Sequence, residues 1–258
     1  MSITISENIR YFRKSISSRL SDGISLKNLC FSYSPEKPVL QDISFDFTAG
    51  KSYAIVGGSG CGKSTLLNLL MAGRSDYSGS ISFDGQELRS IDAESLYKLI
   101  SLVQQNVFVF NSSIRDNISM FQDFSAEDID KAIQLSGLES LIRERGSDYL
   151  CGENGSALSG GEKQRISIAR SLLRKANVLL VDEATAALDA KTASHVASSI
   201  LDLEGVTKIV VTHSMDENLL SRYDCILVLK NGSIAESGKF CELMEKKDYF
   251  YSLFTVAQ

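Results

Sequence analysis

The order of hydrophobic and polar residues divides most of the chain into strand-like and helix-like segments. An early run, 24–33, is strand-like, and residues 43–47 alternate between apolar and polar, which is typical of a strand with one buried face. Later segments are continuous apolar runs, which indicate strands covered on both faces of a parallel sheet. Near the end, Asn231-Gly232 lies between two apolar runs and predicts a β-hairpin. The predicted strands are 24–33, 43–47, 53–56, 100–103, 178–181, 209–211, 226–229 and 233–236.

Helical patterns are concentrated in the middle of the chain. One helix is predicted at 64–72, directly after a buried strand. Between about residues 112 and 176 the pattern is mainly helical, with helices predicted at 126–136, 138–145 and 162–175. Strands that alternate with helices indicate an α/β fold. The sequence therefore predicts a parallel-sheet core with an inserted helical lobe.

The first 22 residues carry a different pattern. Four basic residues (Arg10, Arg13, Lys14 and Arg19) stand against Glu7 alone, and Ile5, Ile9, Phe12, Ile16 and Leu20 recur at helical spacing. This pattern predicts a basic amphipathic helix with one apolar stripe. The stripe either packs on the same domain or meets a partner outside this segment, and the sequence leaves both alternatives open.

Composition and charge narrow the class of protein. Hydrophobic residues make up 43% and charged residues 23% of the 258 residues, which is ordinary for a globular protein with a sizeable core. The net charge of −5 argues against a protein that mainly grips nucleic-acid phosphates, so we expect no nucleic-acid partner. No stretch reaches the ~20 apolar residues of a membrane span, and none is typical of a secretion signal. The five widely spaced cysteines suit reduced thiols.

Residues 57–64 match a phosphate-binding loop, G-x-x-x-x-G-K-[ST], between a buried strand and a helix. Glycines let backbone N–H groups wrap an anion, and the helix directs its positive end at the phosphates. The motif places Lys63 on the β- and γ-phosphates and the Ser64 hydroxyl on Mg²⁺. Cys61 has no catalytic role that we can assign. Its position favours a reactive thiolate, so we expect a maleimide to label it.

Two carboxylates follow the apolar strand 178–181. Asp182 and Glu183 lie at the C-terminal edge of the predicted sheet, where α/β proteins bind their ligands. We expect Asp182 to orient Mg²⁺ and Glu183 to polarise an attacking water. The phosphate loop and this acidic strand end together predict a nucleotidase.

A second candidate anion site lies at the start of the helix predicted at 162–175. Ser159 is a good N-cap, and Gly160 and Gly161 leave the helix N-terminus bare. One chain therefore carries two helix ends that suit phosphate, about a hundred residues apart.

These motifs, in this order, resemble the ATP-binding cassette family from about Ser25 to the C-terminus. The stretch Leu158-Ser159-Gly160-Gly161-Glu162 is similar to the family signature. Four further positions look like family elements: Gln105 like the lid glutamine, Leu188-Asp189 like the loop across the dimer interface, His213 like the switch histidine, and Tyr33 like the aromatic that stacks on adenine.

The resemblance implies a P-loop NTPase fold, with a parallel-sheet core, an antiparallel β subdomain and an inserted α-helical subdomain. It implies ATP and Mg²⁺ as ligands. It also implies a head-to-tail dimer with a second copy or a homologous ATP-binding domain, each ATP lying between one phosphate loop and the other chain's signature. The implied nucleotide-binding residues are Tyr33, Gly57, Gly58, Ser59, Gly60, Cys61, Gly62, Lys63, Ser64, Thr65, Gln105, Asp182 and His213. The implied catalytic residues are Lys63, Gln105, Glu183 and His213, and the implied metal ligands are Ser64, Gln105 and Asp182.

Several stretches are similar to the exporter branch of the family, which moves drugs, lipids or peptides. They include Gly152-Glu153-Asn154-Gly155 before the signature and residues 110–118 after the lid glutamine. The sequence departs from the family pattern at Val107, Asn154, Glu162 and Ala186. None of these departures touches Lys63, Glu183 or His213, so we expect a site competent for hydrolysis.

The exporter resemblance also implies how the chain is organised. We expect residues 23–258 to form the ATP-binding domain, with its helical subdomain at about 107–160 and the signature helix to about 176. Residues 1–22 would be an amphipathic linker remnant from a membrane domain. A transmembrane domain is the implied partner, docking on an exposed apolar patch at 108–110, and the implied location is the cytoplasmic face of the membrane, with the isolated domain soluble. An importer ATPase on a separate membrane subunit and a soluble non-transport cassette protein remain alternatives.

Overall fold

The computed structural model describes residues 14–104, 106–185 and 187–257. Its centre is a six-stranded sheet in the order β10-β9-β3-β8-β7-β6. Neighbouring strands are parallel, except that β10 is antiparallel to β9. The strands are β3 (Ser52–Gly57), β6 (Ile100–Val103), β7 (Val178–Asp182), β8 (Thr207–Val211), β9 (Cys225–Lys230) and β10 (Ser233–Gly238). The β9–β10 turn has positive φ angles at Asn231 and Gly232, which confirms the predicted hairpin.

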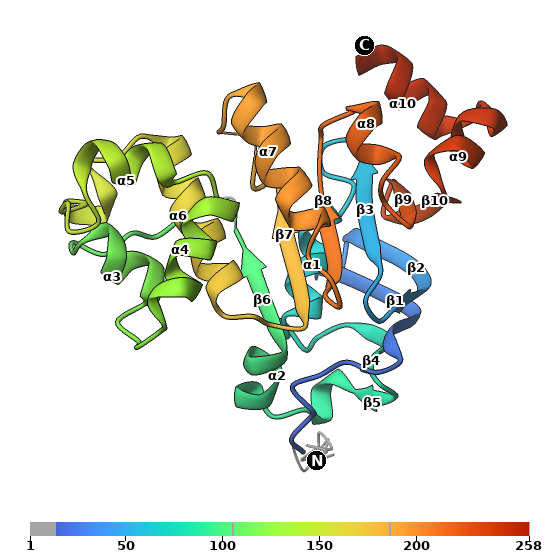
Figure 1. The fold of residues 1–258 in the computed structure, drawn as a ribbon. Coiled ribbons are helices and arrows are strands. Elements are labelled where there is room, and N and C mark those ends of the chain that lie inside the picture. Colours follow the sequence, from blue (N-terminus) through green and yellow to red (C-terminus); the bar gives the residue numbers. More distant parts are fainter. Residues whose placement is uncertain (1–13, 105, 186, 258) are drawn as a thin grey trace.

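A second, antiparallel sheet lies beside the first (Figure 1). It has the order β2-β1-β4-β5, formed by β1 (Gly23–Ser34), β2 (Lys37–Thr48), β4 (Ser78–Phe83) and β5 (Gln86–Glu87). Helix α1 (Lys63–Leu70) buries its leucines in the core that these two sheets share. The phosphate loop that precedes α1 is therefore anchored by packing against both sheets.

The central strands are buried on both faces, as their continuous apolar runs predict. Tyr53 and Ile55 belong to the core between the two sheets, whereas Ala54 and Val56 belong to a core on the other face. Successive strand side chains point to opposite faces, so an apolar residue is needed at every position. Helices α7 (Ala190–Leu201), α9 (Phe240–Lys246) and α10 (Tyr249–Ala257) contribute residues to the second core.

The helical lobe projects from one side of the core (Figure 1). It contains α3 (Ile114–Ser119), α4 (Ala126–Leu135), α5 (Glu139–Arg145) and α6 (Gly160–Leu173) around a hydrophobic cluster of its own. Helix α6 also inserts Ile168 into the core of the sheet, so it joins the lobe to the core. The short helices α2 (Ala93–Leu99) and α8 (Glu217–Leu220) complete the fold. The parallel sheet, antiparallel sheet and helical lobe confirm the expected fold class.

The helix expected in the N-terminal segment is wrong where the structure describes it. Residues 14–20 form an extended strap on the domain, while residues 1–13 lie outside the described residues. The Lys14 and Leu20 N–H groups donate to the Ser90 carbonyl (2.6 Å) and to Asn177 Oδ1 (2.7 Å). These backbone N–H groups therefore bond to the folded domain and not to carbonyls within a helix. Leu20 is buried at 4% exposure, so this end of the stripe packs on its own domain.

Candidate nucleotide site

The phosphate loop connects β3 to α1 and is closed around the side chain of Lys63. This side chain is buried at 5% exposure, and its Nζ donates to the carbonyl oxygens of Gly57 (2.9 Å) and Gly58 (3.1 Å). Gly57 has φ +149°, and a β-carbon there would lie 2.2 Å from the Leu229 carbonyl oxygen. Gly62 precedes α1 with φ +103° and provides no side-chain cap. The first N–H groups of α1 are therefore open to an anion beside a fixed positive charge.

Ser64 and Asp182 bring two oxygen ligands together at the sheet edge. The Ser64 hydroxyl donates to Asp182 Oδ1 at 2.9 Å. Burial raises the pKa of the Asp182 carboxyl, while the Ser64 hydrogen bond opposes this shift. Within the described ranges, no group of three or more His, Cys, Asp or Glu residues could hold a metal ion. The Ser64–Asp182 pair nevertheless suits Mg²⁺, which is commonly held by one or two protein oxygens together with substrate phosphates.

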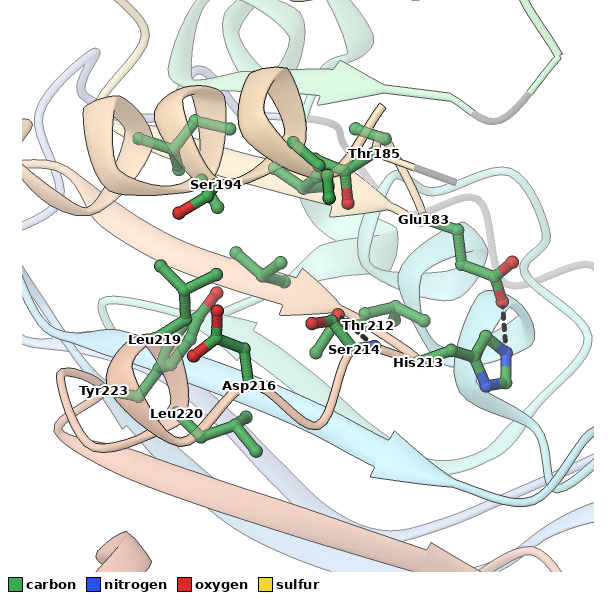
Figure 2. Close-up of a pocket in the computed structure, with 18 residues that line it drawn as sticks. Glu183, Thr185, Ser194, Thr212, His213, Ser214, Asp216, Leu219, Leu220 and Tyr223 are labelled. Carbon is green, nitrogen blue, oxygen red and sulfur yellow. Dashed lines mark hydrogen bonds and ion pairs between the residues drawn. The ribbon is translucent and has the colours of Figure 1, made fainter. Parts of the chain in front are cut away.

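Glu183 and His213 meet because the ends of β7 and β8 are paired in register. Asp182 lies opposite Val211, and the Glu183 N–H donates to the Val211 carbonyl at 3.1 Å. His213 Nε2 lies 2.8 Å from Glu183 Oε1. Figure 2 shows these two side chains at one end of a pocket that extends to Tyr223. Glu183 has φ +50°, a conformation that is unfavourable for a residue with a side chain. Such strained residues cluster at functional sites.

Tyr33 and Cys61 both lie at the phosphate loop, but they differ in exposure. Tyr33 is 60% exposed, and its hydroxyl lies 3.3 Å from the Thr65 hydroxyl. This places an exposed aromatic ring beside the phosphate loop. Cys61 is only 8% exposed, and its sulfur packs toward the core, against Gly57. Cys61 therefore contributes its backbone to the loop, and the low exposure of its thiol counts against the expected labelling by a maleimide, which stays a prediction.

The signature begins α6 with a capping box. The Ser159 hydroxyl accepts from the Glu162 N–H (3.3 Å), and the Glu162 carboxylate accepts from the Ser159 N–H (2.6 Å). Among the described residues no hydrogen bond is made by the N–H groups of Gly160 and Gly161, so they remain open to an anion. Glu162 thus has a structural role at the start of α6.

The signature packs against the expected interface loop. A β-carbon added at Gly161 would lie 3.0 Å from the Ala187 carbonyl oxygen. Asp189 caps α7 by accepting from the Thr192 N–H at 3.0 Å, and this hydrogen bond lowers the pKa of its carboxyl. The expected loop and the signature are therefore neighbours in one chain.

The predicted site residues fall into two groups. One gathers at the carboxyl ends of β3, β7 and β8, comprising Tyr33, the loop 57–65, Asp182, Glu183 and His213. The other comprises the signature and Asp189. No hydrogen bond or ion pair joins the two groups in the part of the chain that the structure describes. Gln105 and Ala186 lie outside the described residues.

Sequence reasoning missed a polar hub formed by Asn117 of α3 and Arg170 of α6, inside the lobe. The Asn117 amide donates to the Phe110 (3.0 Å) and Ser113 (2.9 Å) carbonyls and accepts from the Phe110 N–H (2.8 Å). The Arg170 guanidinium, whose pKa burial lowers, donates to Asn117 Oδ1 (2.7 Å) and to the Phe108 carbonyl. Asn117 lies between two buried isoleucines of α3, and that position was the available signal.

The hub also shapes the expected apolar patch at 108–110. Phe108 is 61% exposed and packs edge-on against Phe110, with ring centroids 5.0 Å apart. The Phe110 ring in turn contacts Phe121, with centroids 5.4 Å apart. Val109 is fully buried in the lobe, because successive residues of this extended segment face opposite ways. The patch therefore consists of Phe108, Phe110 and Phe121, and the expected contribution of Val109 was wrong.

Comparison with known families decides the assignment. The family model described as ABC transporter matches residues 40–186. The chain belongs to the ABC transporter family. The resemblance that the motifs suggested is thereby confirmed. Within the described residues, no helix of this ABC domain combines the length and apolar character needed to cross a membrane.

The relatives of this ABC domain are of the exporter type. It is 39% identical over 244 residues to an ATP-dependent lipid A-core flippase of Vibrio vulnificus (strain CMCP6), covering 92% of this chain and 42% of that protein. It is 38% identical over 241 residues to the iron-sulfur clusters transporter atm1, mitochondrial, of Aspergillus fumigatus, covering 91% of this chain and 33% of that protein. A solved bacterial Atm1-family ABC exporter with ATP bound superposes with a TM-score of 0.88 at 32% identity, covering 95% of this chain and 43% of that one. The chain thus spans less than half the length of these relatives.

Proposed function

We propose that this ABC domain is the ATP-hydrolysing motor of an exporter. The contact between Glu183 and His213 carries the proposal, because it sets a carboxylate and an imidazole beside the buried Lys63 and the Ser64–Asp182 pair. Such a constellation suits attack of water on a γ-phosphate. The exporter-type relatives favour this function over an importer subunit or a soluble cassette protein.

Each residue has a stated part in the proposed reaction. The open N–H groups of the loop and the Lys63 ammonium hold the β- and γ-phosphates and offset their charge. Ser64 and Asp182 would hold Mg²⁺, which supplies charge neutralisation at the phosphate oxygens. His213 orients the Glu183 carboxylate, which takes the proton of the attacking water. Gln105 completes the proposed set of catalytic and metal-binding residues.

A second chain completes the proposed site. The open N–H groups of Gly160 and Gly161 do not reach the phosphate loop of their own chain through any contact in the described ranges. We infer that two copies, or one copy and a homologous domain, pair head to tail and enclose two ATP molecules. Asp189 would then lie at the interface between the chains.

The proposed motor works on a membrane partner. An exposed aromatic patch usually marks an interaction surface, and Phe108, Phe110 and Phe121 form such a patch. We propose that a transmembrane domain docks there, at the cytoplasmic face of the membrane. Residues 1–22 would be a linker remnant between that transmembrane domain and the ATP-binding domain at residues 23–258. The transported substrate would be chosen by the membrane domain.

The substitution Glu183→Gln tests this function. Glutamine keeps the size of the side chain but loses the negative charge that takes the proton. We expect ATP turnover to fall about 10²–10⁴-fold. ATP binding should survive, because Lys63, Ser64 and the loop are unchanged. Bound ATP would then persist, and gel filtration with ATP and Mg²⁺ should show a stable dimer.

The matched control is Glu217→Gln, which changes an exposed glutamate in the first turn of α8. It should retain wild-type turnover. A Glu183→Gln variant with near wild-type turnover would remove Glu183 from catalysis. A dead variant that binds ATP and stays monomeric would retain the catalytic role of Glu183 and contradict the two-chain site.

A further inference from the structure

Tyr33 is an exposed side chain that is nevertheless held on several sides. Its ring is 60% exposed, a condition in which a tyrosine normally changes rotamer freely. Here the ring packs edge-on against the buried Phe31, with centroids 4.9 Å apart and an interplanar angle of 86°. Its hydroxyl lies 3.3 Å from the Thr65 hydroxyl of the phosphate loop. These contacts fix both the inner edge and the tip of the ring.

A third restraint comes from Arg74, which lies outside every motif of the sequence. Its guanidinium carbon is 5.7 Å from the centroid of Tyr33 and 5.4 Å from that of Phe31. Arg74 is itself held by Asp76, through Nε to Oδ1 (2.9 Å) and Nη2 to Oδ2 (2.6 Å). An exposed ion pair of this kind contributes little to stability. Its consequence is to fix a planar cation against the Tyr33 ring.

We propose that Arg74 is a positioning residue that holds Tyr33 as the stacking platform for the purine base of ATP. The inference rests on the proposed function, in which Tyr33 meets the base while the adjacent loop binds the phosphates. A ring that is already oriented loses less freedom when a base stacks on it. The cation also adds an attraction to the ring that a neutral residue cannot supply. Asp76 acts on Tyr33 only through Arg74, because its carboxylate holds the Arg74 guanidinium in place.

The test measures equilibrium binding of ATP and of inorganic triphosphate, both with Mg²⁺, by calorimetry. Arg74→Met should weaken ATP binding about two- to fivefold, the effect of one exposed cation–π contact. Binding of triphosphate should not change, because triphosphate has no base to stack. Arg74→Lys and Asp76→Asn should give smaller losses in the same direction. In steady-state assays, Arg74→Met should raise KM and leave kcat unchanged.

The matched control is Arg222→Met, which removes a comparable exposed ion pair with Asp202. It should bind both ligands like the wild type. In a Tyr33→Ala background, Arg74→Met should have no further effect, since the residue acts through the ring. Equal losses for ATP and triphosphate, unchanged ATP binding, or a full effect without Tyr33 would each overturn the inference.

These outcomes separate the inference from the proposed function. A wild-type chain that binds no ATP would overturn both. If Tyr33→Ala weakens ATP binding and Arg74→Met does not, the base platform stands and only the role of Arg74 is wrong.

Discussion

At the scale of single residues, the buried polar side chains determine how rigidly the site is held. Asn117 is fully buried, and every hydrogen bond of its amide goes to the segment 110–113, to Arg170 or to Cys151. This one residue therefore fixes the aromatic patch to the helix that begins with the signature. Lys63 has the equivalent part in the phosphate loop, where its ammonium is bonded to two loop carbonyls.

We expect Asn117→Ala to lower the free energy of unfolding by about 1–3 kcal/mol, because it leaves the half-buried Phe110 N–H and part of the Arg170 guanidinium without these partners. Urea denaturation followed by circular dichroism measures the change. Asn218→Ala is the control, since its exposed side chain lies in α8 and should cost less than about 0.5 kcal/mol. Equal stability of the two variants would show that the hub is not a determinant of stability.

At the scale of elements, a serine N-cap stabilises the start of two helices, and at one of them it also borders the proposed ATP site. Ser125 caps α4 by accepting from the Asp128 N–H at 3.1 Å, and Ser159 caps α6 in the same way. The α4 cap lies in the lobe, away from the predicted site. The α6 cap leaves two glycine N–H groups open, and these are the groups that the proposed function directs at ATP.

Comparison of Ser125→Ala with Ser159→Ala separates helix stabilisation from the proposed role at the ATP site. Each substitution should destabilise the domain by about 0.5–2 kcal/mol, the ordinary cost of a lost N-cap. Only Ser159→Ala should also lower ATPase activity, because its hydroxyl orders the signature. Thermal unfolding and ATPase assays on the two purified variants measure both effects. If the two variants lose activity equally, the signature cap has no functional part of its own.

At the scale of the whole molecule, each chain has two separate groups of site residues, which are half-sites in the proposed dimer. The phosphate-loop group lies at the ends of β3, β7 and β8, while the signature begins a helix of the lobe (Figure 1). A head-to-tail pair would bring each half-site against its complement and bury the open N–H groups of both. In a symmetric pair of this kind, every contact between the two chains occurs twice.

Specific ATPase activity should therefore rise with protein concentration until the dimer is saturated. The reason is that, in the proposed dimer, a single chain supplies only half of each site. Turnover per chain measured over a wide dilution series, at saturating ATP and Mg²⁺, provides the test. Lys63→Met should stay inactive at every concentration and reports contaminating activity. Activity per chain that is independent of concentration, while sedimentation shows monomers, would contradict the in-trans site.

The sequence alone determined the strands of the central sheet and the motif chemistry, because both depend on short-range rules. Hydrophobic runs required burial on both faces and predicted the central strands, and Asn231-Gly232 predicted the hairpin. The glycine spacing and Lys63 predicted a phosphate loop from local sequence, without knowledge of its place in the fold. The Ser159 cap and its two glycines likewise specified an open helix end.

Only the tertiary structure decided which distant residues meet. Periodicity predicted an apolar stripe that includes Ile16 and Leu20 but not the surface that the stripe packs against, and the expected helix was wrong at 14–20. The expected exposure of Val109 was wrong because its side chain points into the core of the lobe. Likewise, only the structure places the Cys61 thiol against the core between the two sheets. Strand register placed His213 against Glu183, and the pairing of β1 with β4, the strand that follows Arg74, placed Arg74 against Tyr33. Such contacts depend on long-range chain geometry, which residue patterns do not encode locally.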